Sequence, residues 1–216
     1  PEALDAGKLF NLIGQDDVEG LEALLSQFVD YEGVHGLLTR MRSPLPADSE
    51  HERIIFTSKE GGEVTANTFN PLTYALWKES TNCLKYLVRT FGLKTFIQRD
   101  PIAVDIKGKD FKFSNTLLPL LLLVEDQAVT DFLMKQPEFI LEKDDLKNLC
   151  EACRMNNWLA GYKRIFWSPT SLFYFRTLAF GEQREIISET IKSITATERQ
   201  EYVKDLVTET FKHPPY

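Results

Sequence analysis

The chain has 216 residues, of which 43% are hydrophobic and 26% are charged, and its formal net charge is −7. This is the composition of a globular protein, and the length allows one large domain with a continuous core, so the sequence excludes a chain that stays disordered. Because an acidic chain repels phosphate backbones and anionic lipid, we expect no nucleic-acid partner.

The cysteine content and the length of the apolar runs indicate the cellular compartment of the protein. The three cysteines are odd in number and lie in apolar helical patterns, so we expect no disulfide framework and a reducing compartment. No charged-then-apolar leader follows Pro1, so we expect no signal peptide. The longest apolar run, 117–124, has eight residues where about 20 are needed to span a bilayer, so we expect no membrane insertion. These observations favour an intracellular protein, located in the cytoplasm.

Residues 7–30 predict a first helical hairpin. Apolar residues recur at i, i+3 and i+4, which is the period of a helix with one buried face, at Leu9, Leu12, Val18, Leu21, Leu24 and Leu25. Residues 14–17 form the turn between its two helices. A hairpin of this size cannot bury its own apolar face, so it needs neighbours stacked against it.

A loop and a predicted β-hairpin follow. Residues 43–52 contain Pro44 and Pro46 among polar residues and predict a loop. Residues 53–69 place Gly61-Gly62 between β-branched segments, which is typical of a β-hairpin.

Residues 70–91 predict the clearest helical hairpin. Its apolar positions have the spacing of two short antiparallel helices joined by a turn near 79–82, at Pro71, Leu72, Ala75, Cys83, Leu84, Leu87 and Val88. Residues 102–113 then alternate apolar and polar residues around Lys107-Gly108-Lys109 and predict a second β-hairpin.

The rest of the chain continues the pattern with lower regularity. Residues 115–136 and 147–166 predict a third and a fourth unit with similar apolar spacing, and Asn156-Asn157 lie in the turn of the fourth. Residues 171–194 predict a fifth unit that matches this spacing only loosely. Residues 197–212 predict a terminal helix capped by Thr195 or Thr197. The aromatic residues Phe166, Trp167, Phe173, Tyr174 and Phe175 are expected to fill the contact between the fourth and fifth units.

These units together predict one domain spanning 1–216. Equivalent starts at Gly7, Asn70, Asn115 and Lys147 are 63, 45 and 32 residues apart, and the last interval is close to the period of about 33 found in such stacks. The two longer intervals contain the β-hairpins. The predicted fold class is all-α, an α-solenoid of stacked helix-turn-helix units with β-hairpin insertions and a C-terminal capping helix.

The second unit resembles an ankyrin repeat, whose motif is T-P-L-H-x-A. Residues 70–75 read N-P-L-T-Y-A, which keeps the Pro, Leu and Ala and has Asn and Thr where the family favours Thr and His. Residues 9–13, 17–19 and 24–25 resemble a first repeat. Residues 115–120 have lost the Pro-Leu order, and the fourth unit keeps only the apolar offsets and Ala152. Tetratricopeptide and HEAT pairs share the general pattern, and the preceding hairpins favour ankyrin.

The resemblance implies a function and a surface. Ankyrin arrays bind proteins on a concave surface made of hairpin fingers and inner helices. By this resemblance the partner-binding residues would be Trp77 and Lys78 in the second unit and Arg154 and Met155 in the fourth. It implies no cofactor.

The cysteines, histidines, glycines and acidic residues that often form catalytic or binding sites have structural interpretations in this sequence. Cys150 and Cys153 lie inside a helical pattern rather than at a helix N-terminus, and a zinc site would need two further ligands, so we interpret both as packing residues. His51 and His213 are expected in solvent, and His35 under the loop after the first unit. The glycines 61, 62 and 108 are turn residues, and Asp144-Asp145 caps a helix.

Two short segments offer alternative partners. Residues 107–112, with three lysines and Phe111, suit either a solvated hairpin face or contact with an acidic partner or RNA. Pro214-Pro215-Tyr216 matches part of a proline-rich ligand without completing a motif.

Three functional hypotheses follow from the sequence. The first is a non-catalytic protein-protein interaction scaffold that binds a protein partner through inner helices and hairpin fingers. The second is an ankyrin-like regulatory module of a larger protein, such as a channel, kinase or adaptor. The third is a helical enzyme with its site between repeats, using Cys83 or Cys150 and a histidine. We favour the first and therefore expect no catalytic residue and no metal.

Overall fold

The described part of the chain is mainly helical, as the sequence predicted, and it also contains one antiparallel sheet. The structure, a computed structural model, describes residues 3–43, 54–57, 63–66, 69–97, 102–106, 108–115, 117–121, 126–139, 142–156, 176, 178–191 and 204.

The N-terminal helical hairpin consists of α1 (Ala6–Gly14) and α2 (Val18–Leu25). Each helix begins after an aspartate: Asp5 accepts a hydrogen bond from the backbone N–H of Lys8, and Asp17 accepts one from Gly20. Such caps satisfy N–H groups that have no partner within the helix. Of the apolar stripe predicted from the sequence, Leu9, Leu21 and Leu25 are buried, and Leu12, Val18 and Leu24 are half-buried. Ile13, which was not in the predicted stripe, is buried with them.

A segment that the sequence did not predict follows α2. The 3₁₀ turn η1 (Ser26–Phe28) leads into a short helix, α3 (Val34–Arg40), which buries Val34 and Leu38. This helix packs against the second 3₁₀ turn, η2 (Leu93–Thr95). It thereby links the first helical hairpin to the end of the second.

The second helical hairpin consists of α4 (Pro71–Trp77) and α5 (Thr81–Phe91). Asn70 precedes α4, accepts from the N–H of Thr73 at 2.9 Å, and donates its amide to the carbonyl of Phe96 at 2.6 Å. Pro71 occupies the first helical position, where its missing N–H costs nothing. Gly92 ends α5 with φ +84°, a conformation that favours glycine.

The turns of these two hairpins share one hydrogen-bond pattern. In the first turn the N–H groups of residues 15, 16 and 17 bond to the carbonyls of 11, 13 and 12. In the second, 63 residues later, residues 78, 79 and 80 bond to 74, 76 and 75. Asp16 and Glu79 occupy the same place in the two turns, and both have positive φ, 50° and 58°.

The four strands lie inside the two predicted β-hairpins, 53–69 and 102–113. β1 (Ile54–Thr57) pairs with β2 (Glu63–Ala66), and β3 (Ile102–Ile106) pairs with β4 (Lys109–Phe113). The two hairpins were predicted as separate insertions, but β2 also pairs with β3 through Thr65 and Asp105, so the sheet order is β1-β2-β3-β4. In β4, Phe111 and Phe113 are buried.

The remaining described helices follow the sheet. α6 (Leu118–Leu121) and α7 (Gln127–Met134) lie within the predicted third unit, 115–136. α8 (Lys143–Asn156) begins before the predicted start at 147 and ends at the predicted turn. The second helix of the fourth unit and residues 171–175 lie outside the described residues. α11 (Phe180–Ile191) lies within the loosely matching fifth unit, 171–194. Of the predicted terminal helix, 197–212, the structure describes only Lys204.

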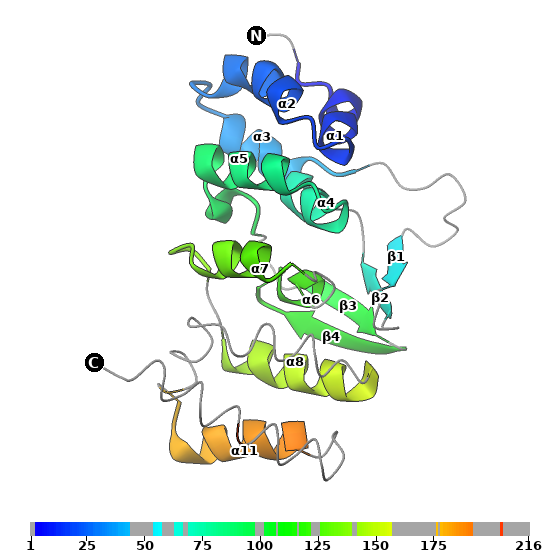
Figure 1. Ribbon diagram of the computed structural model, residues 1–216, viewed down its shortest axis with the longest axis vertical. Coiled ribbons are helices and arrows are strands. Elements are labelled where there is room, and N and C mark those ends of the chain that lie inside the picture. The colour runs from blue at the N-terminus through cyan, green and yellow to red at the C-terminus, as the bar shows by residue number, and fades with distance from the viewer. Residues whose placement is uncertain are drawn as a thin grey trace.

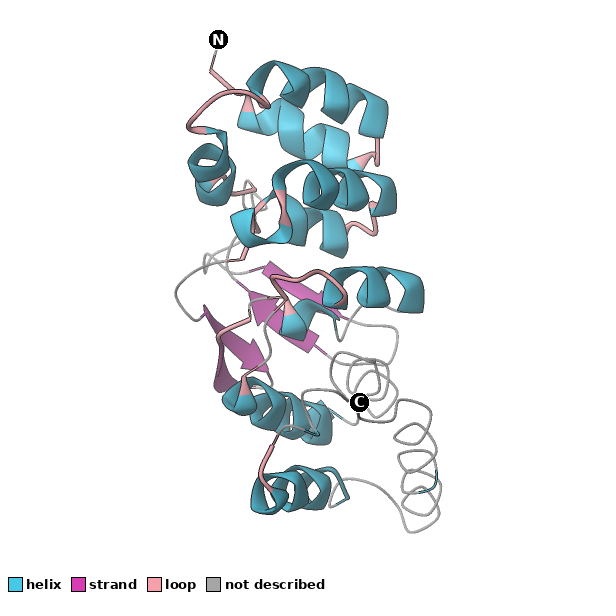
Figure 2. Ribbon diagram, turned by 90° about the vertical axis from the view of Figure 1, so that its left-hand side faces the viewer, coloured by secondary structure: helices cyan, strands magenta, loops and turns pink. Residues whose placement is uncertain are grey.

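The elements follow one another along the long axis of the molecule. Figure 1 shows α1–α2, α4–α5 and α6–α7 one below another, with α8 and α11 beyond them. Figure 2 shows the strands between the helices above and below them. The contacts agree with this order, because α1 packs on α4, α4 on α6, α6 on α8, and α8 on both β4 and α11. One hydrophobic cluster extends from Leu9 in α1 to Ala152 in α8.

Candidate interaction surface

Four aromatic rings form a continuous row beside α4. We call Phe10, Phe69, Tyr74 and Trp77 the aromatic row. Tyr74 meets Phe10 of α1 edge to face at 5.2 Å between ring centroids, and it meets Trp77 at 5.8 Å. Trp77 in turn packs on Phe69 at 5.1 Å. Edge-to-face pairs of this kind contribute about 0.5–1.5 kcal/mol beyond burial.

Lys78 lies over this row. Its ammonium group is 4.6 Å from the centroid of the Trp77 ring and 5.8 Å from that of Tyr74. Lys78 is exposed, Trp77 and Tyr74 are half-buried, and Phe10 and Phe69 are buried. Burial also raises the pKa of the Tyr74 hydroxyl, which keeps that hydroxyl neutral and able to donate a hydrogen bond.

The four residues predicted to bind a partner do not form one described site. Trp77 and Lys78 lie together at the end of α4, but Trp77 also packs against the hydrophobic core. Arg154 and Met155 belong to the last turn of α8, and their side chains lie outside the described residues. The side chains of Cys150 and Cys153 lie outside them too, as do His51 and His213.

The contact between the first two helical hairpins, which we call the first seam, is closed by polar bonds. The Asp16 carboxylate accepts from the backbone N–H of Cys83 at 2.9 Å and from the Asn82 amide at 3.0 Å. The Ser80 hydroxyl donates to the carbonyl of Ile13. A turn residue of one hairpin therefore caps the second helix of the next hairpin.

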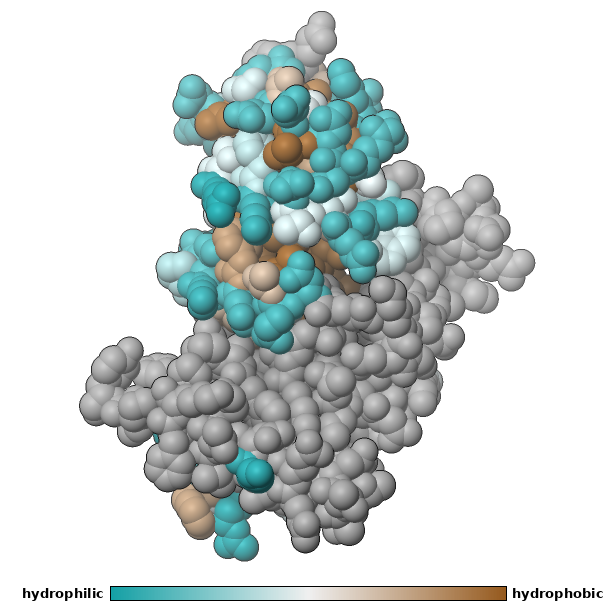
Figure 3. Space-filling model, in the orientation of Figure 1, coloured by the Kyte–Doolittle hydropathy of each residue, from teal (hydrophilic) through white to brown (hydrophobic). Residues whose placement is uncertain are grey.

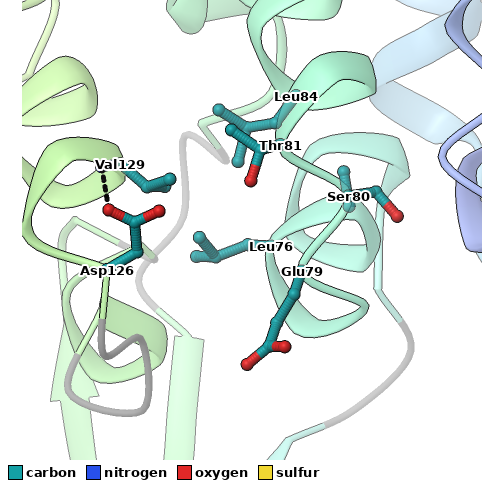
Figure 4. A pocket seen from close by; sticks show the side chains of 8 residues that line it. Leu76, Glu79, Ser80, Thr81, Leu84, Asp126 and Val129 are labelled. Carbon is teal, nitrogen blue, oxygen red and sulfur yellow. Dashed lines mark hydrogen bonds between the residues drawn. The ribbon is translucent and has the colours of Figure 1, made fainter.

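The contact between α4–α5 and α7, which we call the second seam, contains a pocket of about 310 Å³. Its apolar wall comes from Ala75, Leu76, Leu84 and Val129, and its polar rim comes from Glu79, Ser80, Thr81 and Asp126. Figure 4 shows side chains of the α4–α5 turn on one side and Asp126 and Val129 on the other. The Asp126 carboxylate accepts from the N–H groups of Ala128 and Val129 at 2.9 and 3.4 Å, so α7 is capped by its own residue.

Cys83 is a packing residue in this structure. Its side chain is fully buried, and burial, together with a hydrogen bond to Asp16, raises the pKa of its thiol to about 12. A thiol of this kind carries almost no thiolate at neutral pH. The enzyme hypothesis therefore finds no activated nucleophile at Cys83.

His35 does not lie under a loop, as the sequence suggested. It is exposed on α3, and its Nδ1 is 2.7 Å from the Thr95 hydroxyl oxygen. That hydroxyl donates its only proton to the carbonyl of Phe91, so His35 must donate from Nδ1. The ring also meets Phe91 edge to face at 6.3 Å, and His35 thus ties α3 to the end of α5.

The basic hairpin 107–112 is attached to α8. Lys109 pairs with Glu151, and its ammonium group is 5.2 Å from the centroid of the Phe111 ring. Asn148 donates to the carbonyl of Lys112 at 2.7 Å. The Lys109 side chain is still 49% exposed, so its contacts with Glu151 and Phe111 do not remove it from solvent. Phe111 is buried, whereas stacking on an RNA base would need it exposed.

Asp145 does more than cap α8. Its carboxylate is buried and accepts from the backbone N–H groups of Ser114 and Asn115 at 2.8 and 3.2 Å. Burial raises the pKa of this carboxyl group above its ordinary value, although both hydrogen bonds act in the opposite direction. Asp145 therefore fastens α8 to the junction between β4 and α6.

Among the described residues there is no group of three or more His, Cys, Asp or Glu side chains that could hold a metal ion. None of the described helices is long and apolar enough to cross a membrane. Figure 3 shows mainly hydrophilic residues on the described surface of one face, with small hydrophobic patches among them.

Comparison with known proteins adds no relative. No family model matches the chain, and no curated protein or solved structure matches it at a significant level.

The seam residues are the ones that sequence reasoning missed. Asp16 and Glu79 were predicted as turn residues, and Asp126 was not singled out. Aspartate tolerates positive φ and accepts bonds from nearby N–H groups, so an Asp in a helix-helix turn was the available signal. Its partner, however, is 67 residues away and is not visible in the local pattern.

Proposed function

We propose that this chain is a non-catalytic protein-protein interaction scaffold, built as a divergent array of ankyrin-like helical hairpins. The observation that carries the proposal is the aromatic row with Lys78 above it, which runs across two successive helical hairpins. Trp77 and Tyr74 are half-buried, and tryptophan and tyrosine are among the residue types that dominate protein-protein binding energy.

The turn geometry supports the array. The two turns 63 residues apart share a hydrogen-bond pattern and a positive φ at the same place. The buried Asn70 and Asn115 both accept a hydrogen bond from an N–H at the start of the following helix, that of Thr73 and that of Leu117. These similarities favour related units rather than unrelated helices. Helices fixed by such seams offer a preorganised surface, which lowers the ordering cost of binding.

The experiment that tests the proposal is partner capture with the Lys78→Glu variant. Lys78 is exposed, so reversal of its charge should leave the melting temperature within about 2 °C, because surface substitutions change stability by less than about 0.5 kcal/mol. Lys94→Glu is the matched control, since Lys94 is an exposed lysine on η2. Partners captured from the native source by wild type should be depleted by Lys78→Glu and retained by Lys94→Glu. Equal capture by all three chains would refute the proposed surface.

Trp77→Ala is a weaker test than the sequence suggested. Because Trp77 packs on Phe69 and on the core, its removal should also lower stability, by about 1–3 kcal/mol for a half-buried aromatic ring. Loss of binding by that variant alone would not separate a contact residue from a folding residue.

A further inference from the structure

We infer that the pocket in the second seam binds a basic side chain, lysine or arginine, from the partner. The inference rests on the proposed scaffold function, and it assigns a chemical class to one contact of that partner.

The second seam is open because its capping residue differs from that of the first. In the first seam Asp16 reaches across to the N–H of Cys83. Glu79 occupies the same place in the second turn, but the start of α7 is already capped by Asp126. Among the described residues, no hydrogen bond or ion pair holds the Glu79 carboxylate. The pocket lies beside this carboxylate.

The electrostatics of the pocket favour a cation. The N-termini of α5 and α7 lie at the pocket and together supply about +1 charge, at about +0.5 for each helix end. Glu79 and Asp126 on the rim supply two negative charges, and both are exposed. The basic residues nearest the pocket are directed elsewhere: Lys78 points its ammonium group at the aromatic row, and Lys85 and Arg89 of α5 lie over the Phe132 ring of α7. Among the described residues, Glu79 and Asp126 therefore line the pocket without an ion pair, in a chain whose overall charge is −7.

The shape of the pocket selects a long side chain with an apolar stem. Leu76, Leu84 and Val129 are at most 5% exposed and form its wall, while both carboxylates are on the rim. Lysine and arginine bury a methylene stem along apolar surface and keep the charge at the polar edge. A small inorganic cation would leave the apolar wall without a contact, and an anion would be repelled.

Nuclear magnetic resonance of the full chain with N-acetyl-arginine-N-methylamide tests the inference. The probe should shift the amide signals of Leu84 and Val129 with a dissociation constant on the order of 1 mM, as expected for a ligand of this size. The citrulline analogue has the same length without the charge, and it should bind at least fivefold more weakly.

Two conservative variants locate the site. Glu79→Gln and Asp126→Asn should each weaken the arginine probe about two- to fivefold, and both together about tenfold. Asparagine retains the cap of α7, so folding should be unaffected. Glu22→Gln removes an exposed carboxylate on α2 that does not line the pocket, and it should change nothing.

The outcomes separate this inference from the scaffold function. An absence of shifts at Leu84 and Val129, equal binding of citrulline, or unchanged binding by the double variant overturns the pocket assignment. Capture that depends on Lys78 would in those cases still support the scaffold. Binding of arginine at the pocket without any Lys78-dependent partner would instead support the pocket chemistry and refute the proposed surface around Lys78.

Discussion

The first seam makes a sharp prediction about Asp16. Replacing Asp16 with alanine removes the acceptor for the N–H of Cys83 and places alanine at a φ of 50°. Loss of a helix cap costs about 0.5–2 kcal/mol, and a left-handed alanine costs about 1–2 kcal/mol. The sum predicts that Asp16→Ala lowers the free energy of unfolding by about 3 kcal/mol. For a chain of this size the melting temperature should fall by about 9 °C.

Matched variants separate the two causes. Asp16→Asn keeps an acceptor oxygen and tolerates positive φ, so it should cost less than about 1 kcal/mol. Asp16→Gly relieves the backbone but loses the cap, so it should fall between the other two. Glu79 has the same backbone conformation, and among the described residues its side chain makes no hydrogen bond, so Glu79→Gly should be neutral or stabilising by up to about 1 kcal/mol.

Urea unfolding followed by circular dichroism measures all four variants. The order expected from most to least stable is Glu79→Gly, Asp16→Asn, Asp16→Gly, Asp16→Ala. If Asp16→Asn were as damaging as Asp16→Ala, the hydrogen bond to Cys83 would not be the cause. If Glu79→Gly cost as much as Asp16→Gly, the distinction between the two seams would be wrong.

Two further predictions concern buried titratable groups. The first uses a Cys150→Ser/Cys153→Ser background, in which Cys83 is the remaining cysteine. Because the pKa of the Cys83 thiol is raised from 9.0 to about 12, it should react with a disulfide reagent at pH 8 about a thousandfold more slowly in the native than in the unfolded chain. Comparable rates would show that the thiol is accessible in the native chain. The second concerns Asp145, whose pKa is raised by burial, so the native state holds the carboxyl proton more tightly than the unfolded chain does. The contribution of this proton to stability is therefore fully present below pH 3.8, and it falls as the pH rises through the native pKa. The stability of wild type relative to Asp145→Asn should therefore decrease from pH 4 to pH 7 in urea titrations, and a constant difference would contradict the burial argument.

The helical hairpins were predictable because their signals are local. Apolar recurrence over one helix, Pro71 at a first helical position and Asn70 before it all act within a few residues. The β-hairpins were visible for the same reason, since turn glycines and alternation lie within about 15 residues. Helix α3 was missed because its seven residues carry only a short apolar pattern, and its stability comes from packing on η2.

The features that position the candidate surface are non-local, and local pattern does not encode them. The pairing of Thr65 with Asp105 joins two hairpins that each look complete alone. The bond from Asp16 to Cys83 depends on how one hairpin lies on the next. Trp77 was predicted to bind a partner because the resemblance to ankyrin arrays places it on an inner helix. In the structure Trp77 also packs on Phe69, which precedes the helix, so its side chain contributes to folding as well as to the candidate surface.

The two seams differ in spacing by one residue and in the residue that caps the second helix. Asn70 and Asn115, which precede α4 and α6, are 45 residues apart, whereas the residues before α5 and α7, Ser80 and Asp126, are 46 apart. Asp126 accepts from the N–H groups of Ala128 and Val129 at the start of α7, whereas the start of α5 has no side-chain cap of its own and is bonded by Asp16. Glu79 then keeps the turn conformation of Asp16 without its partner. The second seam lacks the bond that Asp16 makes across the first, and the Glu79 carboxylate and an apolar wall line its pocket. Binding capacity is therefore expected where the pattern is broken, rather than where it is best kept.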